Sequence, residues 1–118
     1  MSIERIESGP RMSQAVIFNK IVYLAGQVAD DGTGPSIALQ TASVLRAIDA
    51  LLAKASSDKS RLLSVTVYLT DMDDFAAMNG AWDAWVDPKA TPARATVVSP
   101  RLAGTEYKIE ISVVAAQR

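Results

Sequence analysis

The sequence predicts an α+β fold in which two helices cover one face of a mixed β-sheet. Two segments show the apolar spacing of amphipathic helices, and short segments rich in β-branched residues flank and separate them. The expected order β-β-α-β-α-β-β is the pattern of such a two-layer domain. The chain has 118 residues, 49% of them apolar, which is enough for the core of one domain, residues 1–118, without disulfides or metal.

The charge balance disfavours several classes of partner. Twelve basic and thirteen acidic residues give a formal net charge of −1, so we expect no surface for nucleic acid or an anionic membrane. No apolar run approaches the length of about 20 residues that spans a bilayer. The opening residues MSIERIESGP also lack the basic and apolar regions of a signal peptide. The sequence therefore predicts a soluble, cytoplasmic protein.

The chain contains no cysteine and no histidine, which restricts the chemistry open to it. Cys–His dyads, Ser-His-Asp triads and the usual zinc and iron ligand sets are excluded. The segment GTGPS at residues 32–36 lacks the lysine and the spacing of a phosphate-binding loop, so we interpret it as a plain loop. Any catalysis must use carboxylates, hydroxyls, arginine, lysine, backbone groups or water.

The N-terminal half is predicted to form a hairpin followed by a helix. In residues 15–25, AVIFNKIVYLA, two apolar runs are broken by Asn19–Lys20, a pair that fits a two-residue turn. An edge strand around Ile3–Ile6 is expected to precede this hairpin. Apolar residues then recur at helical spacing over residues 37–55, and Ser36 is the candidate N-terminal cap.

The C-terminal half is predicted to add three strands and a second helix. Residues 62–69, LLSVTVYL, alternate in polarity as a half-buried strand does. Residues 71–86 place large apolar side chains at helical spacing, behind aspartates that suit the first turn of a helix. Residues 91–98, TPARATVV, and residues 106–116, EYKIEISVVAA, complete the sheet. In the last segment the odd-numbered residues are expected to face the helices.

Arg94 stands out because it interrupts a strand of small and β-branched residues, and a guanidinium is rarely buried without a partner. If this strand pairs with the last one, Arg94 and Glu110 lie together on the sheet face away from the helices. That face would also expose Val98 and Val114, and would need a second subunit to cover it. From the pattern alone, an Arg–Glu pair is more often a structural or interface contact than a ligand site.

Several segments resemble one known family. TPARATVV followed by YKIEI resembles the C-terminal signature of the Rid (YjgF/RidA) family. SQAVIFNKIVYLAGQV resembles its opening hairpin, which ends in Gly-Gln, and DMDDFAAMN resembles its Asp-x-x-Asp-Phe-x-x-x-Asn helix start. These motifs occur in the right order, and the resemblance extends over essentially the whole chain.

The resemblance implies a chorismate-mutase-like fold, assembled as a homotrimer with three clefts between subunits. It also implies an imine or enamine deaminase, which hydrolyses reactive 2-imino acids such as 2-iminopropanoate and 2-iminobutanoate to 2-oxo acids and ammonia. No metal or organic cofactor is expected. This agrees with a chain free of histidine and cysteine, because a protonated imine is already electrophilic and mainly needs orientation and a positioned water.

The resemblance also assigns roles to single residues. The family's substrate-carboxylate arginine corresponds to Arg94, and its water-activating glutamate corresponds to Glu110. Its helix-start asparagine corresponds to Asn79, and backbone amides near Ala95 and Thr96 are expected to bind substrate as well. A planar guanidinium can hold a carboxylate through two parallel charge-assisted hydrogen bonds, which would fix the imino carbon.

Three positions depart from the family pattern. Met12 stands where many members carry a tyrosine, Ala25 where they carry a serine, and Thr96 where they carry a cysteine. Two hydroxyls and a thiol are therefore missing from the inferred cleft, while the arginine and the glutamate are kept. We expect the core reaction with an altered substrate range, and Met12 suggests a more apolar pocket.

Two other functions remain open. One is a trimeric module that binds or senses small carboxylates and turns over poorly, and the other is a ribonuclease, a label that some family members carry. Neutral charge, few aromatic residues and the lack of histidine disfavour the ribonuclease. Glu110 favours the deaminase over the binding module, because a nearby carboxylate hinders anion binding. The preferred imino acid, its source, and a role in metabolite damage control or in one catabolic route also stay open.

Overall fold

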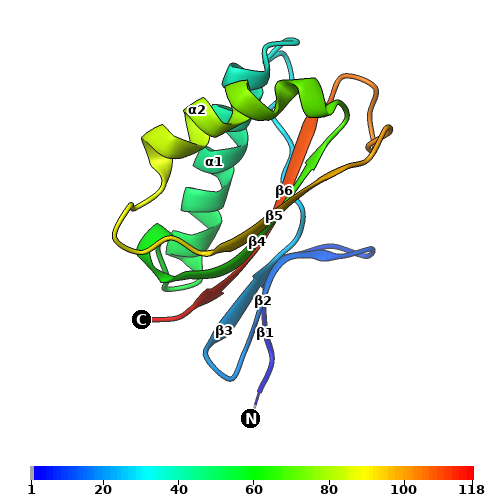
Figure 1. Cartoon of the computed structure of the whole chain (residues 1–118). Helices are drawn as coiled ribbons and strands as arrows, with labels where there is room; N and C mark the ends of the chain where they lie inside the picture. The colour runs from blue at the N-terminus through cyan, green and yellow to red at the C-terminus, as the bar shows by residue number, and fades with distance from the viewer. Residues whose placement is uncertain (1) are drawn as a thin grey trace.

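The computed structural model describes residues 2–118, which form a mixed six-stranded sheet with two helices packed on one face (Figure 1). The helices are α1 (Ile37–Lys54) and α2 (Phe75–Trp85), and neither is long and apolar enough to cross a membrane. Short 3-10 turns, η1 (Lys59–Arg61) and η2 (Met72–Asp74), precede the fourth strand and α2. The strands are β1 (Glu4–Ser8), β2 (Ser13–Phe18), β3 (Ile21–Leu24), β4 (Leu62–Leu69), β5 (Ala93–Val98) and β6 (Ile109–Ala116). The predicted α+β class is confirmed.

The N-terminal predictions are confirmed in detail. Asn19 and Lys20 have φ angles of 53° and 62°, which are the left-handed values that a tight two-residue hairpin turn requires. The Ser36 side chain accepts a hydrogen bond of 3.2 Å from the Leu39 amide and caps α1. The expected edge strand is also present, although it begins one residue later and ends two residues later than predicted.

The strand order is β1-β2-β3-β6-β4-β5, so the last two strands of the chain are not neighbours. β4 lies between β5 and β6, parallel to β5 and antiparallel to β6. Parallel neighbours need a crossover connection, and α2 supplies it between β4 and β5. The direct pairing of β5 with β6, which was the condition for Arg94 and Glu110 to lie together, is therefore not present.

The core lies between the sheet and the helices. In β4, Val65, Val67 and Leu69 are buried, and in β6 the odd-numbered residues from Ile109 to Val113 are buried as well. This alternation confirms that the odd-numbered side of the last strand faces the helices. Val44, Leu45, Ile48 and Leu52 of α1 cover these positions from the other layer.

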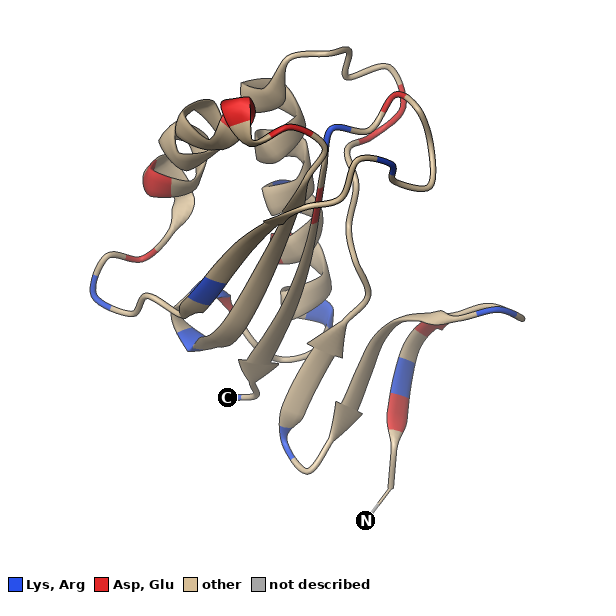
Figure 2. Cartoon of the chain, turned by 45° about the vertical axis from the view of Figure 1, so that its right-hand side comes forward, with Lys and Arg blue, Asp and Glu red and all other residues tan. Residues whose placement is uncertain are grey.

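The opposite face of the sheet is uncovered in the single chain. Phe18 is 41% exposed, Tyr23 is 47% exposed and Val97 is 42% exposed on this open face, and Val114 pairs with Tyr23 there. Val98 was expected here, but it pairs with Leu69 and so belongs to the helix side. Apart from β1, the strands carry few charged positions (Figure 2). An open face with exposed apolar side chains and few charges is typical of a surface that contacts another subunit.

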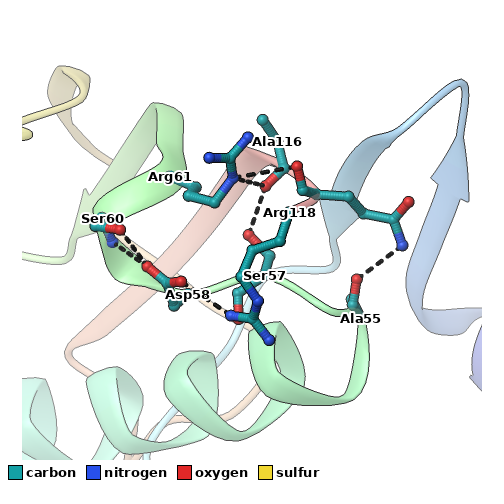
Figure 3. A network of polar contacts seen from close by, with 8 residues as sticks. Ala55, Ser57, Asp58, Ser60, Arg61, Ala116 and Arg118 are labelled. Carbon is teal, nitrogen blue, oxygen red and sulfur yellow. Dashed lines mark hydrogen bonds and ion pairs between the residues drawn. The ribbon is translucent and has the colours of Figure 1, made fainter.

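The C-terminal end of the chain is bound to the turn that follows α1 (Figure 3). Arg118 Nη1 donates to the Ser57 carbonyl and to Asp58 Oδ2, each at 2.9 Å, and Ser57 Oγ donates to the Ala116 carbonyl at 2.7 Å. Asp58 also accepts hydrogen bonds from the hydroxyl and the amide of Ser60. These bonds, followed by the one from Arg118, lower the pKa of the Asp58 carboxyl below its usual value of 3.8. The end of β6 is thereby fixed beside the entry to β4.

Candidate functional site

Arg94 lies on β5 and points toward α2, not away from the helices. Its register partner on β4 is the buried Val65, and opposed residues in a ladder share a face. Its Nη2 donates a 2.8 Å hydrogen bond to Asn79 Oδ1, and its Nη1 lies 3.9 Å from the sulfur of Met78. The guanidinium carbon lies 5.1 Å from the ring centre of Trp82, within the range of a cation–π contact. Three residues of one helix therefore hold this side chain.

None of these three partners of Arg94 carries a carboxylate that would balance its positive charge. The ion pairs found within residues 2–118 join Lys54 to Glu7 and Arg118 to Asp58. A guanidinium has five N–H donors, and the Asn79 oxygen and the Met78 sulfur take two of them. The remaining donors and the full positive charge are available to an anion that reaches this half-buried side chain.

Glu110 lies on the open face and does not contact Arg94 in the single chain. It pairs with Tyr68 of β4, three positions along from Val65. Arg94 and Glu110 lie two strands apart across the sheet and three residues apart along the strands. This places their Cα atoms about 14 Å apart, with the side chains on opposite faces. The prediction that they lie together on one face is therefore wrong, because β4 is inserted between their strands and the register turns Arg94 toward α2.

Gly26 lies directly against the carboxyl group of Glu110. A Cβ added to Gly26 would be 2.8 Å from Glu110 Cδ, closer than real Cβ contacts come. The neighbouring Gln27 holds this segment against β6 through two backbone hydrogen bonds with Ile111, of 2.8 and 3.0 Å. Its side chain also donates to Gln14 Oε1 and to the Ala25 carbonyl. The segment after β3 therefore shapes the surroundings of Glu110.

The remaining predicted residues divide between these two regions. Thr96 is half-buried on the same face as Arg94, opposite Val67, whereas Ala95 is exposed on the open face. Ala25 precedes Gly26 and belongs to the Glu110 region, where its amide donates to the Gln14 carbonyl. Met12 is 49% exposed in the turn between β1 and β2. The described chain thus carries one group of candidate residues around Arg94 and another around Glu110.

Two residues that were not predicted for the site, Trp82 and Gly26, lie beside residues that were. Trp82 is 6% exposed and belongs to the core, and its ring also lies beside Arg94. The available signal was its spacing of three from Asn79, which places both on one face of α2. Gly26 gave no signal beyond its place in the Gly-Gln motif, since only the fold brings Glu110 against it.

Three cavities in the described part of the chain are lined by other residues. The largest, of about 330 Å³, lies inside the loop between β5 and β6, and one of about 230 Å³ lies between residues 29–34 and Tyr107. The third, of about 200 Å³, lies between α1 and the segments that carry Gln14 and Gln27. Among residues 2–118, no three acidic side chains gather closely enough to hold a metal ion.

Comparison with known proteins gives matches over the whole chain. Residues 2–117 match the family described as Endoribonuclease L-PSP. A RutC family protein of Haemophilus ducreyi is 46% identical over 97% of this chain and 96% of its own, and the RutC family protein YoaB of Escherichia coli is 44% identical over 98% and 99%. A crystal structure of a YjgF family member from Neisseria meningitidis, 46% identical, superposes with a TM-score of 0.95 over 100% of this chain and 97% of that one.

Proposed function

Because this chain belongs to the YjgF/Rid family, we propose that it hydrolyses reactive 2-imino acids to 2-oxo acids and ammonia. The observation that carries the proposal is the state of Arg94, whose guanidinium is half-buried and held by Asn79 and Trp82 without a carboxylate partner. Such a group is suited to a substrate carboxylate. Glu110 is the candidate for the group that activates water.

The site requires two subunits, since Arg94 and Glu110 lie on opposite faces of one sheet with β4 between their strands. β5 is an edge strand, so a neighbouring chain can approach Arg94 from the side. The open face around Phe18, Tyr23 and Val97 offers apolar surface for that contact. We propose a closed homotrimer in which each cleft joins Arg94 of one subunit to Glu110 of the next.

The proposed reaction is the addition of water to a C=N bond. Arg94 binds the substrate carboxylate and fixes the adjacent imino carbon. Glu110 accepts a proton from water as the water oxygen attacks that carbon, which gives a tetrahedral amino alcohol. The proton then passes from Glu110 to the nitrogen, and the C–N bond breaks. As ammonia leaves, the hydroxyl group gives its proton to Glu110 and the C=O bond of the 2-oxo acid forms. The protonated imine supplies the electrophile, so Asn79 and Trp82 need only orient Arg94.

The test is a coupled assay in which an amino-acid oxidase generates imino acids and their disappearance is followed. Glu110→Gln keeps the shape of the side chain and removes the base, so imine hydrolysis should fall by about 10²–10⁴-fold. The matched control is Glu4→Gln on the exposed edge strand β1, which should keep full activity. Full activity of the Glu110→Gln variant would reject Glu110 as the base, and no hydrolysis by the unmodified protein with any imino acid would reject the deaminase.

A carboxylate-binding module is the second candidate. It is favoured by one observation, namely that α2 holds Arg94 in place without any contribution from Glu110. In that case pyruvate or 2-oxobutanoate should bind with similar affinity before and after Glu110→Gln, and neither protein should consume imino acids. If the protein is a deaminase, the Glu110→Gln variant should bind these products at least as tightly as the unmodified protein, because a nearby negative charge is lost. Only the unmodified protein should then hydrolyse imino acids.

A further inference from the structure

The loop between β5 and β6 encloses the largest of the three cavities, about 330 Å³ in volume. This loop, orange in Figure 1, projects beyond the end of the sheet. The cavity is lined by Thr70, at the end of β4, and by loop residues that include Arg101, Leu102, Thr105, Tyr107 and Lys108. Its volume is at the lower end of the range for small-molecule sites. All of these residues belong to one chain, so the cavity does not depend on a second subunit.

The cavity lies at the carboxyl ends of the two parallel strands. The Ser99 amide donates to the Leu69 carbonyl at 2.9 Å, and the Thr70 amide donates to the Lys108 carbonyl at 3.1 Å. These bonds bring the ends of β4 and β5 and the entry to β6 together. Crevices beyond the carboxyl ends of parallel strands are frequent ligand sites, because the chain must leave the sheet there and opens a gap between its connections.

The walls of the cavity are held in place by hydrogen bonds. Gln40 of α1 is 2% exposed, and its Oε1 accepts from the Lys108 amide at 2.9 Å while its Nε2 donates to the Glu106 carbonyl at 3.0 Å. At the other end of the loop, Ser99 Oγ donates to the Arg101 carbonyl at 3.0 Å. The backbone that carries both cations is thus fixed before any ligand binds, which lowers the entropic cost of binding.

The cavity combines two cations with several hydroxyl donors. Within residues 2–118, the side chains of Arg101 and Lys108 take part in neither of the ion pairs described above, and the described residues that line the cavity include no carboxylate. Asp31 and Glu106 line the neighbouring cavity, which shares Tyr107 with this one, and the Glu106 carboxyl group also lies beside Gly104 in the wall of this cavity. Figure 2 shows this mixture of blue and red positions beyond the end of the sheet. Burial, then the charges of Glu106 and Asp31 and a hydrogen bond with Glu106, raise the pKa of Tyr107.

We propose that this cavity binds a small organic anion with two negative charges, at a site separate from Arg94. Arg101 can grip a carboxylate or phosphate group through two donors, and Lys108 supplies a second positive charge. Thr70 and Thr105 line the same space, and a hydroxyl of either residue can donate to the remaining oxygens. A ligand with one negative charge leaves one of the two cations unmatched and should bind more weakly.

The test is a titration of the whole protein, labelled with ¹⁵N, with succinate, with inorganic phosphate and with acetate at constant ionic strength. Succinate or phosphate should cause saturable amide shifts in residues 99–108 and at Thr70, with acetate at least tenfold weaker. Arg101→Ala combined with Lys108→Ala should weaken binding at least tenfold. The control variant, Arg46→Ala with Lys89→Ala, removes the same amount of charge from exposed positions elsewhere and should leave dianion binding unchanged. Arg94→Ala should also leave these shifts unchanged.

Three results would overturn the proposal. The first is a titration in which neither dianion shifts the loop amides in a saturable way. The second is equal binding by the two charge-matched double variants, which would indicate attraction to the net charge and not to this cavity. The third is loss of the loop shifts in the Arg94→Ala variant, which would assign the anion to the region around Arg94. Arg101→Gln with Lys108→Gln repeats the test with side chains of similar shape should the alanine variant unfold.

Discussion

At the scale of single residues, Gly26 determines where the carboxyl group of Glu110 can lie. The carboxyl carbon and the Cγ atom occupy the space that a Cβ at Gly26 would need. Gly26 is exposed and has no left-handed φ angle, so its backbone conformation does not require glycine. The requirement at this position is therefore one of space beside Glu110, and a larger residue should act on the site more than on the fold.

Gly26→Ala should reduce imine hydrolysis at least tenfold by displacing the Glu110 carboxyl group from its position. The thermal stability should change little, because alanine fits the backbone and the clash is with a flexible side chain. The matched control is Gly80→Ala in α2, where an added Cβ meets nothing within 4 Å and alanine favours the helix by roughly 1 kcal/mol. The measurements are kcat and the melting temperature of both variants. An unchanged kcat for Gly26→Ala would contradict the role of Gly26 in placing the Glu110 carboxyl group.

At the scale of secondary-structure elements, the sequence correctly predicted the features that depend only on neighbouring residues. Asn19–Lys20 formed the expected turn and Ser36 the expected cap, since both depend on a few neighbouring residues. The alternation in β5 places Arg94 and Thr96 on one face, but a period of two does not say which face. That choice depends on the register with β4, a strand about 30 residues away in sequence, so the position of Arg94 relative to Glu110 was not predictable from the pattern.

The link between the end of β6 and the turn after α1 predicts a pH dependence of stability. Hydrogen bonds from Ser60 and Arg118 lower the pKa of Asp58, so its stabilising effect is full above the ordinary carboxyl value and is lost as the pH falls through the lowered one. Asp58→Asn keeps an oxygen that can accept the hydrogen bonds from Ser60 and removes the negative charge. We expect a loss of about 1 kcal/mol or less at pH 7, because the Asp58 side chain is 43% exposed and its pairing is screened by solvent.

Chemical denaturation of the Asp58→Asn variant between pH 2 and pH 7 checks this effect. The difference from the unmodified protein should be constant above about pH 5 and should vanish toward pH 2, where both side chains are neutral. Asp83→Asn, an exposed aspartate of α2, is the control and should show no such difference. A difference that grows as the pH falls would contradict the sign of the pKa shift.

At the scale of the whole molecule, the single chain carries the two parts of the proposed site in separate places. Arg94 is held by α2 on the helix side near one edge of the sheet, and Glu110 lies with Gly26 on the open face. Assembly through the open face would cover Phe18, Tyr23 and Val97 and bring one half against the other. The proposed activity and the proposed trimer therefore depend on each other, and a protein that stays monomeric in sedimentation at micromolar concentration would lose both.

The most direct test of this account is to mix two inactive variants. Arg94→Ala keeps Glu110, and Glu110→Gln keeps Arg94, so a mixed trimer contains one cleft with both groups intact if each cleft joins two subunits. Equal amounts, unfolded and refolded together, should recover about a quarter of the unmodified activity, since three quarters of random trimers are mixed and each has one active cleft in three. If native mass spectrometry confirms mixed trimers and imine hydrolysis does not return, the shared site is contradicted.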